Sequence, residues 1–250
     1  MSGIHKPSYQ SLFLQMRVNG HDLATGTGFV MFHGGTPYLI TNWHNLSGRH
    51  PSTGKTLSKT AGIPDEVVIM HNQKGKFGNW IPRTEPVLHD DKPLWIEHPT
   101  HAQKVDAVAL PLTNLEDVEL HPYSLGQTGP DIAVPPADVL SIVGFPFGLT
   151  GGGAFAIWAT GFMATEPDIN QFELPAFLVD CRGRPGQSGS AVIAHRKRGP
   201  VTLADGGMQM MRNPITKFLG IYSGRVNDQS DLGIVWKVSA IAEILESTKS

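Results

Sequence analysis

The feature that most constrains the fold is a succession of short apolar runs separated by glycine, proline and asparagine. Only residues 239–247 have a helical pattern, with Ile241, Ile244 and Leu245 on one face and Ser239 as the N-cap. Strands followed by one helix, without alternation of the two, are typical of all-β proteins. The sequence therefore predicts two six-stranded antiparallel β-barrels with a short C-terminal helix. The expected strands are residues 12–18, 24–32, 38–41, 67–70, 80–81, 106–110, 138–144, 154–162, 176–179, 191–194, 218–222 and 232–236.

The domain organisation follows from where these runs are interrupted. With 250 residues, 40% of them apolar, the chain can bury one large all-β core, and we expect a single domain over residues 1–250. The tract 112–136 is rich in Pro, Gly, Asn and Asp and is the expected connection between the halves. This gives an N-terminal barrel over 12–115, a C-terminal barrel over 135–238 and a helix over 239–250.

Composition limits the partners and the compartment. The net charge of −2 gives no field that attracts phosphate, and we interpret the basic cluster 195–198 as a solvated hairpin tip, with a nucleic-acid patch as the alternative. Cys181 is the only cysteine, so no internal disulfide can form. No apolar run reaches the length of a membrane span or a signal-peptide core. We expect a cytoplasmic protein without nucleic-acid or membrane partners, or a mature form whose leader has been removed.

The most informative turn is the segment 184–190, Arg-Pro-Gly-Gln-Ser-Gly-Ser, which precedes an apolar run. Glycine on both sides of the central pair permits backbone conformations closed to other residues, so the N–H groups of Gly186 and Ser188 can share one space while the Ser188 hydroxyl faces outward. This is the geometry of a nucleophile beside an oxyanion hole. The same residue types also form ordinary solvated turns, so the interpretation depends on a base and an acid elsewhere.

Two upstream residues fit those roles. His44 follows an apolar strand within a short turn, and the end of a strand is where a rigid scaffold presents a side chain to a cleft. Asp106 opens the apolar run Ala-Val-Ala-Leu, so we expect it to be partly buried and to need a partner. The alternatives are a structural histidine and an aspartate that caps its own turn.

Four segments, taken in order, are similar to the trypsin-like serine peptidases of the chymotrypsin fold. The resemblance is to the bacterial, disulfide-free branch that includes the HtrA/Deg catalytic domain, and it covers residues 12–244. An α/β-hydrolase is excluded, because that fold requires Gly-x-Ser-x-Gly and an acid followed by a histidine after the serine. The four segments are Thr-Asn-Trp-His (41–44), Asp-Ala-Val-Ala-Leu (106–110), Gly-Phe-Pro-Phe-Gly (144–148) and Gly-Gln-Ser-Gly-Ser-Ala-Val (186–192).

The resemblance implies a mechanism. Ser188 attacks a peptide carbonyl, His44 takes its proton and passes it to the leaving amine, and Asp106 orients the imidazole. The N–H groups of Gly186 and Ser188 hold the oxyanion. The resemblance also places Tyr222, Ser223 and Gly224 on a strand that pairs with an extended substrate and walls the specificity pocket.

Two positions depart from trypsin. Gln187 stands where trypsin has the aspartate that pairs with a newly cut N-terminus, so we expect activity without N-terminal cleavage. Arg182 stands where trypsin has the aspartate at the base of the pocket. A cation there selects acidic side chains unless Asp180 neutralises it, and a small or medium apolar residue before the cut is the preference we favour.

Two classes of function remain. The first is a serine endopeptidase that acts on a protein or peptide substrate, with a protein activator or an oligomer as further partners. The second is a catalytically idle member of the fold that serves as a binding module. The presence of His44, Asp106 and Ser188 together favours the enzyme. No Cys/His cluster has zinc-ligand spacing, so we expect neither a metal nor another cofactor.

Overall fold

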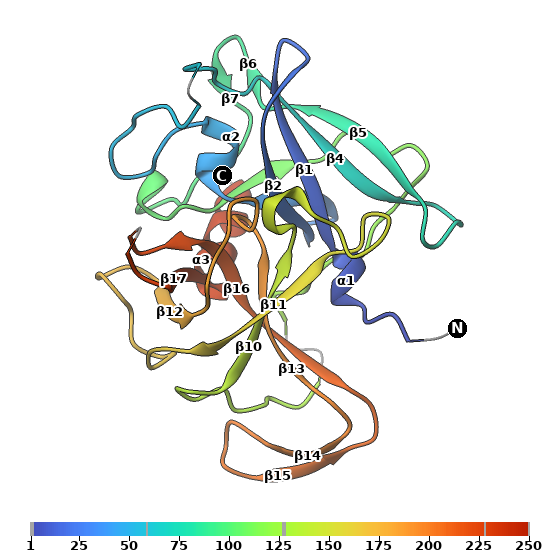
Figure 1. The fold of residues 1–250 in the computed structure, drawn as a ribbon, viewed down its shortest axis with the longest axis vertical. Coiled ribbons are helices and arrows are strands. Elements are labelled where there is room, and N and C mark those ends of the chain that lie inside the picture. Colours follow the sequence, from blue (N-terminus) through green and yellow to red (C-terminus); the bar gives the residue numbers. More distant parts are fainter. Residues whose placement is uncertain (1–2, 59, 127–128, 228, 250) are drawn as a thin grey trace.

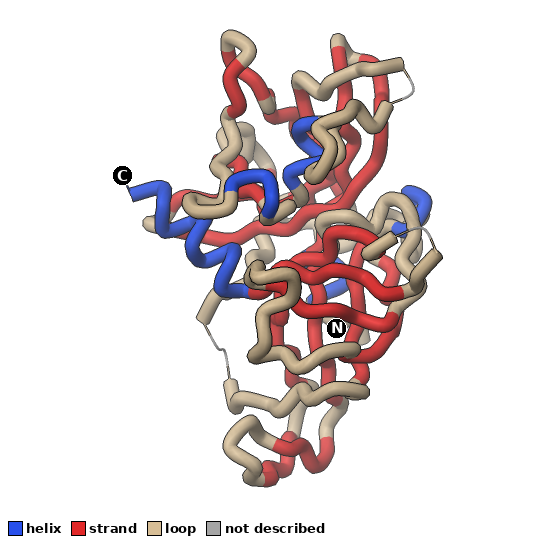
Figure 2. Tube along the Cα trace, turned by 90° about the vertical axis from the view of Figure 1, so that its left-hand side faces the viewer, coloured by secondary structure: helices blue, strands red, loops and turns tan. Residues whose placement is uncertain are grey.

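The computed structural model describes residues 3–58, 60–126, 129–227 and 229–249. The strands gather in two groups joined by residues that cross from one to the other, and Figure 2 shows the groups one above the other. The first group is built from β1 (Ser11–Val18), β2 (His21–His33), β3 (Thr36–Thr41), β4 (Glu66–Gln73), β5 (Trp80–Pro86), β8 (Val108–Pro111) and β9 (Val118–Glu119). The second group is built from β10 (Val139–Gly144), β11 (Ile157–Met163), β12 (Ala176–Asp180), β13 (Ala191–Arg196), β16 (Ile215–Arg225) and β17 (Leu232–Lys237).

The second group closes into a six-stranded antiparallel barrel, in the order β10-β11-β12-β17-β16-β13. Most positions of its strand β10 are buried, and the interior is filled by apolar side chains such as Leu140, Val179 and Val235. The prediction of a closed barrel is therefore confirmed for this half of the chain (Figure 1).

The first group is a seven-stranded sheet in the order β5-β4-β1-β2-β3-β8, with β9 paired to β4. It surrounds its own apolar core, which includes Leu14, Leu39 and Ile69. Residues 94–96 lie between the two sheet edges: the Leu94 N–H donates to the Val87 carbonyl, and Ile96 exchanges two backbone hydrogen bonds with Ala109 of β8. Closure of this sheet into a second barrel, and with it the domain boundaries drawn from the sequence, stays a prediction.

The one long helix among the described residues is α3 (Val238–Glu246), which begins where β17 ends. Its buried face consists of Ala240, Ile241, Ile244 and Leu245, and these side chains share one core cluster with residues from both strand groups. The amphipathic pattern of the sequence therefore predicts both the helix and the face it buries. The expected N-cap is wrong: the N-cap is Lys237, and Ser239 lies within the first turn of the helix. The helix joins the two halves rather than covering one of them.

The remaining elements are short. They are helices α1 (Pro7–Gln10) and α2 (Trp43–Ser47), the 3₁₀ turns Ala102–Lys104, Pro146–Gly148 and Ser247–Lys249, and the hairpins β6 (Leu88–His89) with β7 (Lys92–Pro93) and β14 (Gly199–Thr202) with β15 (Met208–Met211). The basic cluster 195–198 is a solvated turn only in part, since Lys197 and Arg198 are exposed between β13 and β14. It begins inside β13, where His195 packs edge-on against Trp158 and Arg196 forms an ion pair with Asp138.

Candidate active site

The two upstream candidates come from neighbouring strands of the first sheet. β3 runs into α2, whose second residue is His44, and Asp106 lies two residues before β8. Because Thr41 pairs with Val108 across these strands, the two side chains start from adjacent points at one end of the sheet. His44 and Asp106 are far apart in the sequence, and the pairing of β3 with β8 brings them together at one rigid edge of the sheet.

His44 and Asp106 are joined by two hydrogen bonds. The His44 ring Nδ1 lies 2.6 Å from Asp106 Oδ2, and the His44 backbone N–H donates to Asp106 Oδ1 over 2.9 Å. Asp106 is buried, and its backbone carbonyl accepts a hydrogen bond of 2.5 Å from the Asn42 amide. This arrangement holds the proton on Nδ1 and leaves Nε2 as the basic nitrogen.

Ser223, on β16 of the closed barrel, forms the third hydrogen bond to the Asp106 carboxylate. Its hydroxyl donates to Asp106 Oδ2 over 2.5 Å, so the acid is held from both strand groups. Burial alone raises the pKa of Asp106. The His44 charge and the hydrogen bonds from the His44 ring, the Ser223 hydroxyl and the His44 N–H outweigh burial, so the pKa of Asp106 lies below its usual value. The carboxylate is therefore ionised at neutral pH and can stabilise a cationic imidazole.

Ser188 lies in the turn before β13 and is held by its backbone. Its carbonyl accepts hydrogen bonds from the Thr27 N–H (2.9 Å) and from the Asn45 side-chain amide (3.2 Å), both of which belong to the first half of the chain. The Ser188 hydroxyl donates to the Ser223 carbonyl over 3.0 Å. Ser188 and His44 line the same cavity, so rotation about the serine side chain redirects its hydroxyl within a shared space.

The peptide groups before Ser188 are oriented by two hydrogen bonds. The Pro185 carbonyl accepts from the Phe147 N–H (2.6 Å), and the Gly186 carbonyl accepts from the Thr27 hydroxyl (2.9 Å). Because a trans peptide directs its N–H opposite its C=O, the Gly186 N–H points away from Phe147. Within the described part of the chain, neither this N–H nor that of Ser188 donates to another group. The two amides are thus free to bind an oxyanion.

Gly186 is required where it stands. Its φ of +87° is in the left-handed region that favours glycine, and a Cβ at this position meets the Phe145 carbonyl oxygen at 2.4 Å. The neighbouring Gln187 is fully buried, and its side-chain carbonyl accepts from the Arg184 N–H over 2.7 Å. The hydrogen bond between Gln187 and Arg184 therefore stabilises the turn from within.

The residues expected to bind substrate do not lie together on one open surface. Arg182 is exposed, so its side chain is not a buried cation at the base of a pocket. Tyr222 is buried, and both its backbone groups are already paired, its N–H with the Ser190 carbonyl and its carbonyl with the Gly189 N–H. Ser223 and Gly224 are half-buried where β16 and β17 change register. The substrate roles of these four residues stay predictions.

Sequence reasoning missed two supporting residues, Thr27 and Asn45. Thr27 is fully buried, and its N–H and hydroxyl hold the carbonyls of Ser188 and Gly186. The signal available in the sequence was the run Gly-Thr-Gly-Phe at 26–29, in which small residues leave room for a close approach. A Cβ on Gly26 meets the Asn45 side-chain amide at 2.9 Å. That pattern is common in strands, so it does not by itself mark a site.

A cavity of about 250 Å³ opens between the two halves beside Ser188. His44, Asn45, Pro185, Gly186 and Ser188 form its chemical end, and the rest of its wall comes from the first strand group and the loop after α2. The residues that line the cavity therefore carry a base, a hydroxyl and two amide N–H groups without an acceptor among the described residues, which are the groups that acyl transfer requires.

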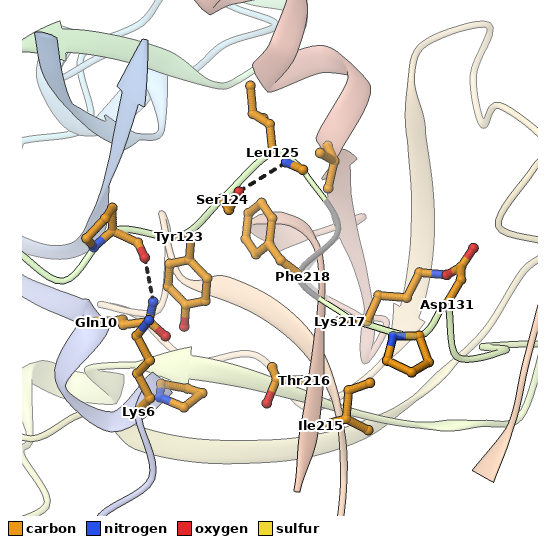
Figure 3. Close-up of a pocket in the computed structure, with 16 residues that line it drawn as sticks. Lys6, Gln10, Tyr123, Ser124, Leu125, Asp131, Ile215, Thr216, Lys217 and Phe218 are labelled. Carbon is orange, nitrogen blue, oxygen red and sulfur yellow. Dashed lines mark hydrogen bonds and ion pairs between the residues drawn. The ribbon is translucent and has the colours of Figure 1, made fainter. Parts of the chain in front are cut away.

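A second cavity, of about 380 Å³, lies elsewhere between α1, residues 122–126 and 129–131, and the start of β16 (Figure 3). Tyr123 and Phe218 pack against each other on its wall, and Lys217 forms an ion pair of 2.6 Å with Asp131. None of the predicted catalytic residues lines it. In the described part of the chain no group of three or more His, Cys, Asp or Glu side chains is arranged to hold a metal ion, and no described helix is long and apolar enough to cross a membrane.

Solved structures with the same fold include a serine endoprotease from Yersinia pestis. The similarity has a TM-score of 0.54 at 15% sequence identity and covers 96% of this chain, which spans 62% of the length of that protease. The Rv3671c protease from M. tuberculosis, in its active form, is also similar, with a TM-score of 0.48, 16% identity, and coverage of 96% of this chain and 81% of that one. No protein-family model and no curated protein matches the chain.

The chain has the fold of the trypsin-like, HtrA-type serine peptidases. At 15% identity the Yersinia comparison establishes the fold alone. What the site does has to be argued from its own groups.

Proposed function

We propose that this protein is a serine endopeptidase that cleaves peptide bonds through a covalent acyl-enzyme. Ser188 is the nucleophile, His44 the general base and then general acid, and Asp106 the group that orients the imidazole and stabilises its charge. The observation that carries the proposal is the paired contact of His44 with Asp106, 2.6 Å from the ring and 2.9 Å from the backbone, on the wall that also holds Ser188.

The first half of the reaction forms the acyl-enzyme. The Ser188 hydroxyl turns from the Ser223 carbonyl toward His44 Nε2, gives up its proton and adds to the substrate carbonyl carbon. The carbonyl oxygen becomes an oxyanion, which the Gly186 and Ser188 N–H groups receive. His44 then protonates the leaving amine, and the C–N bond breaks.

The second half of the reaction regenerates the free enzyme. Water gives a proton to His44 and adds to the acyl carbon. The bond between the acyl carbon and the Ser188 oxygen then breaks, His44 protonates that oxygen, and the product carboxylic acid is released. Asp106 stays ionised throughout, since its hydrogen bonds and the His44 charge hold its pKa low although burial opposes this.

Two local features support activity without N-terminal processing. Gln187 cannot form an ion pair, and its side chain already braces the turn through the Arg184 N–H. The Pro185 carbonyl is fixed by the Phe147 N–H, which keeps the Gly186 N–H directed to the other side. The orientation of the oxyanion donors therefore depends on groups within the chain rather than on a new terminus.

The test is intact-mass analysis after exposure of the full chain to a fluorophosphonate, with the Ser188→Ala and His44→Ala variants in parallel. We expect one phosphonyl adduct on the wild type and none on either variant. The covalent adduct reports activation of the serine hydroxyl independently of any substrate preference. An unlabelled wild type contradicts an activated serine and favours the binding module.

A further inference from the structure

The space around Ser188 is divided unequally. On the His44 side lies the cavity of about 250 Å³, which is smaller than the ~300–1,000 Å³ of small-molecule sites and suits one side chain. Its wall beyond the catalytic groups is largely apolar, from Met16, Leu23, Leu57 and Pro64. None of the described residues that line it is Asp, Glu, Lys or Arg.

On the side of the Ser223 carbonyl, which accepts the Ser188 hydroxyl, the preceding residue of β16 is Tyr222, whose ring is buried. A Cβ on Gly183 comes within 1.8 Å of the Tyr222 hydroxyl oxygen, and a Cβ on Gly233 within 2.4 Å of the ring. The ring therefore lies between the loop that leads to Ser188 and strand β17, and it fits there because both neighbours are glycine. Tyr222 is 1% exposed, and its hydroxyl has no hydrogen-bond partner within the described part of the chain.

The chemistry decides which part of a substrate meets each side. His44 has to protonate the leaving nitrogen, so the residue after the scissile bond lies beside His44. The acyl group is attached to Ser188, whose hydroxyl reaches the Ser223 carbonyl, so the residue before the bond lies beside Ser223 and its neighbour Tyr222. The open cavity thus faces the leaving side and the filled space faces the acyl side.

We propose that this peptidase selects substrates chiefly by an apolar side chain after the scissile bond, bound in the cavity beside His44, while Tyr222 restricts the residue before the bond to Gly, Ala or Ser. The inference rests on the proposed serine endopeptidase activity. It departs from the alternative of a pocket with Arg182 at its base, because Arg182 is exposed. It also narrows the preference favoured from the sequence, a small or medium apolar residue before the cut, to the smallest side chains.

The test uses internally quenched peptides with constant flanks, varied at the two positions beside one bond, with the cleaved bond located by mass spectrometry. The position before the bond is Gly, Ala, Leu, Phe or Arg, and the position after it is Gly, Leu, Phe or Glu. For the wild type, we expect kcat/KM to be about 10-fold or more higher with Leu than with Gly after the bond. We expect it to fall about 100-fold when Phe or Arg replaces Ala before the bond.

Two variants separate the two sides. Tyr222→Val removes the ring. The ratio of kcat/KM for Ala to kcat/KM for Phe before the bond should decrease by about 10-fold or more, and the preference after the bond should be retained. Ala24→Phe places a large side chain at an exposed position on the cavity wall. The ratio of kcat/KM for Leu to kcat/KM for Gly after the bond should decrease, and the Ala-to-Phe ratio before the bond should stay as in the wild type. If Tyr222→Val does not fold, the wild-type profile and the Ala24→Phe ratios still decide the proposal.

The outcomes are distinguishable. Cleavage that depends on Ser188 but accepts Phe or Arg before the bond as readily as Ala, or shows no preference after the bond, overturns the specificity proposal and leaves the peptidase standing. Absence of cleavage in every peptide, or cleavage that persists in Ser188→Ala, overturns the peptidase itself and the inference with it.

Discussion

His71 makes the stability of the first sheet depend on pH. It lies on β4, on the same face of the strand as the core residues Val67 and Ile69. It is buried, and neither ring nitrogen has a hydrogen-bond partner within the described residues. Burial, and then the charge of Arg83, lower the pKa of His71 to about 4 from 6.5. The folded protein therefore holds this histidine neutral, whereas the unfolded chain binds a proton below pH 6.5.

The sign and size of the effect follow from this difference. Because the unfolded state binds the extra proton, stability is complete above pH 6.5, falls as the pH decreases, and stops falling near pH 4. The full loss is about 3 kcal/mol, at about 1.36 kcal/mol for each unit of pKa. Between pH 7 and pH 4.5 we expect the free energy of unfolding to decrease by about 2 kcal/mol.

The assay is urea unfolding followed by tryptophan fluorescence at pH 7, 6, 5 and 4.5, for the wild type and for His71→Leu. The variant removes the titrating group and fills the site with an apolar side chain, so the wild type should lose about 2 kcal/mol more than the variant across this range. Replacement of the exposed His21 by Gln is the matched control and should keep the wild-type slope. Equal slopes for the wild type and His71→Leu would refute the reasoning.

Three further predictions concern the site. Ser223→Ala removes a hydrogen bond to the Asp106 carboxylate and should lower kcat about 10- to 100-fold, measured in steady state, with the Ser223→Thr variant recovering part of the loss; full activity in Ser223→Ala would contradict a positioning role. Asp106→Asn should lower kcat on the order of 10⁴-fold at neutral pH, because the amide favours the wrong imidazole tautomer, and a loss below about 10-fold would argue against the triad. Gly186→Ala should abolish fluorophosphonate labelling, since its Cβ meets the Phe145 carbonyl at a φ of +87°; labelling at the wild-type rate would show that this turn is not the oxyanion donor.

Strand pattern and chain order predicted much of this architecture. The expected runs coincide with the strands of the closed barrel, and the amphipathic segment after residue 238 is α3. The short strands β6, β7, β9, β14 and β15 were not predicted, because two to four residues are too few to show a periodicity. Their positions depend on pairing with distant segments, which a local pattern does not record.

For the site, the sequence by itself determined which residue types are available and where the backbone needs glycine. His44 after a strand, Asp106 before one and Ser188 in a glycine turn are local features, since each depends on neighbours along the chain. Strand pairing then brings His44 and Asp106 to 2.6 Å, and this contact follows directly from β3 lying beside β8.

Only the tertiary structure decided how the two halves complete each other. Thr27 and Asn45 from the first half hold the Ser188 carbonyl, and Ser223 from the second half holds Asp106. Tertiary packing also placed the Tyr222 ring between two glycines that are far from it in sequence. Hydrogen bonding and steric exclusion act over a few ångströms in space, whatever the separation along the chain, so a linear pattern carries no record of which side of Ser188 is open.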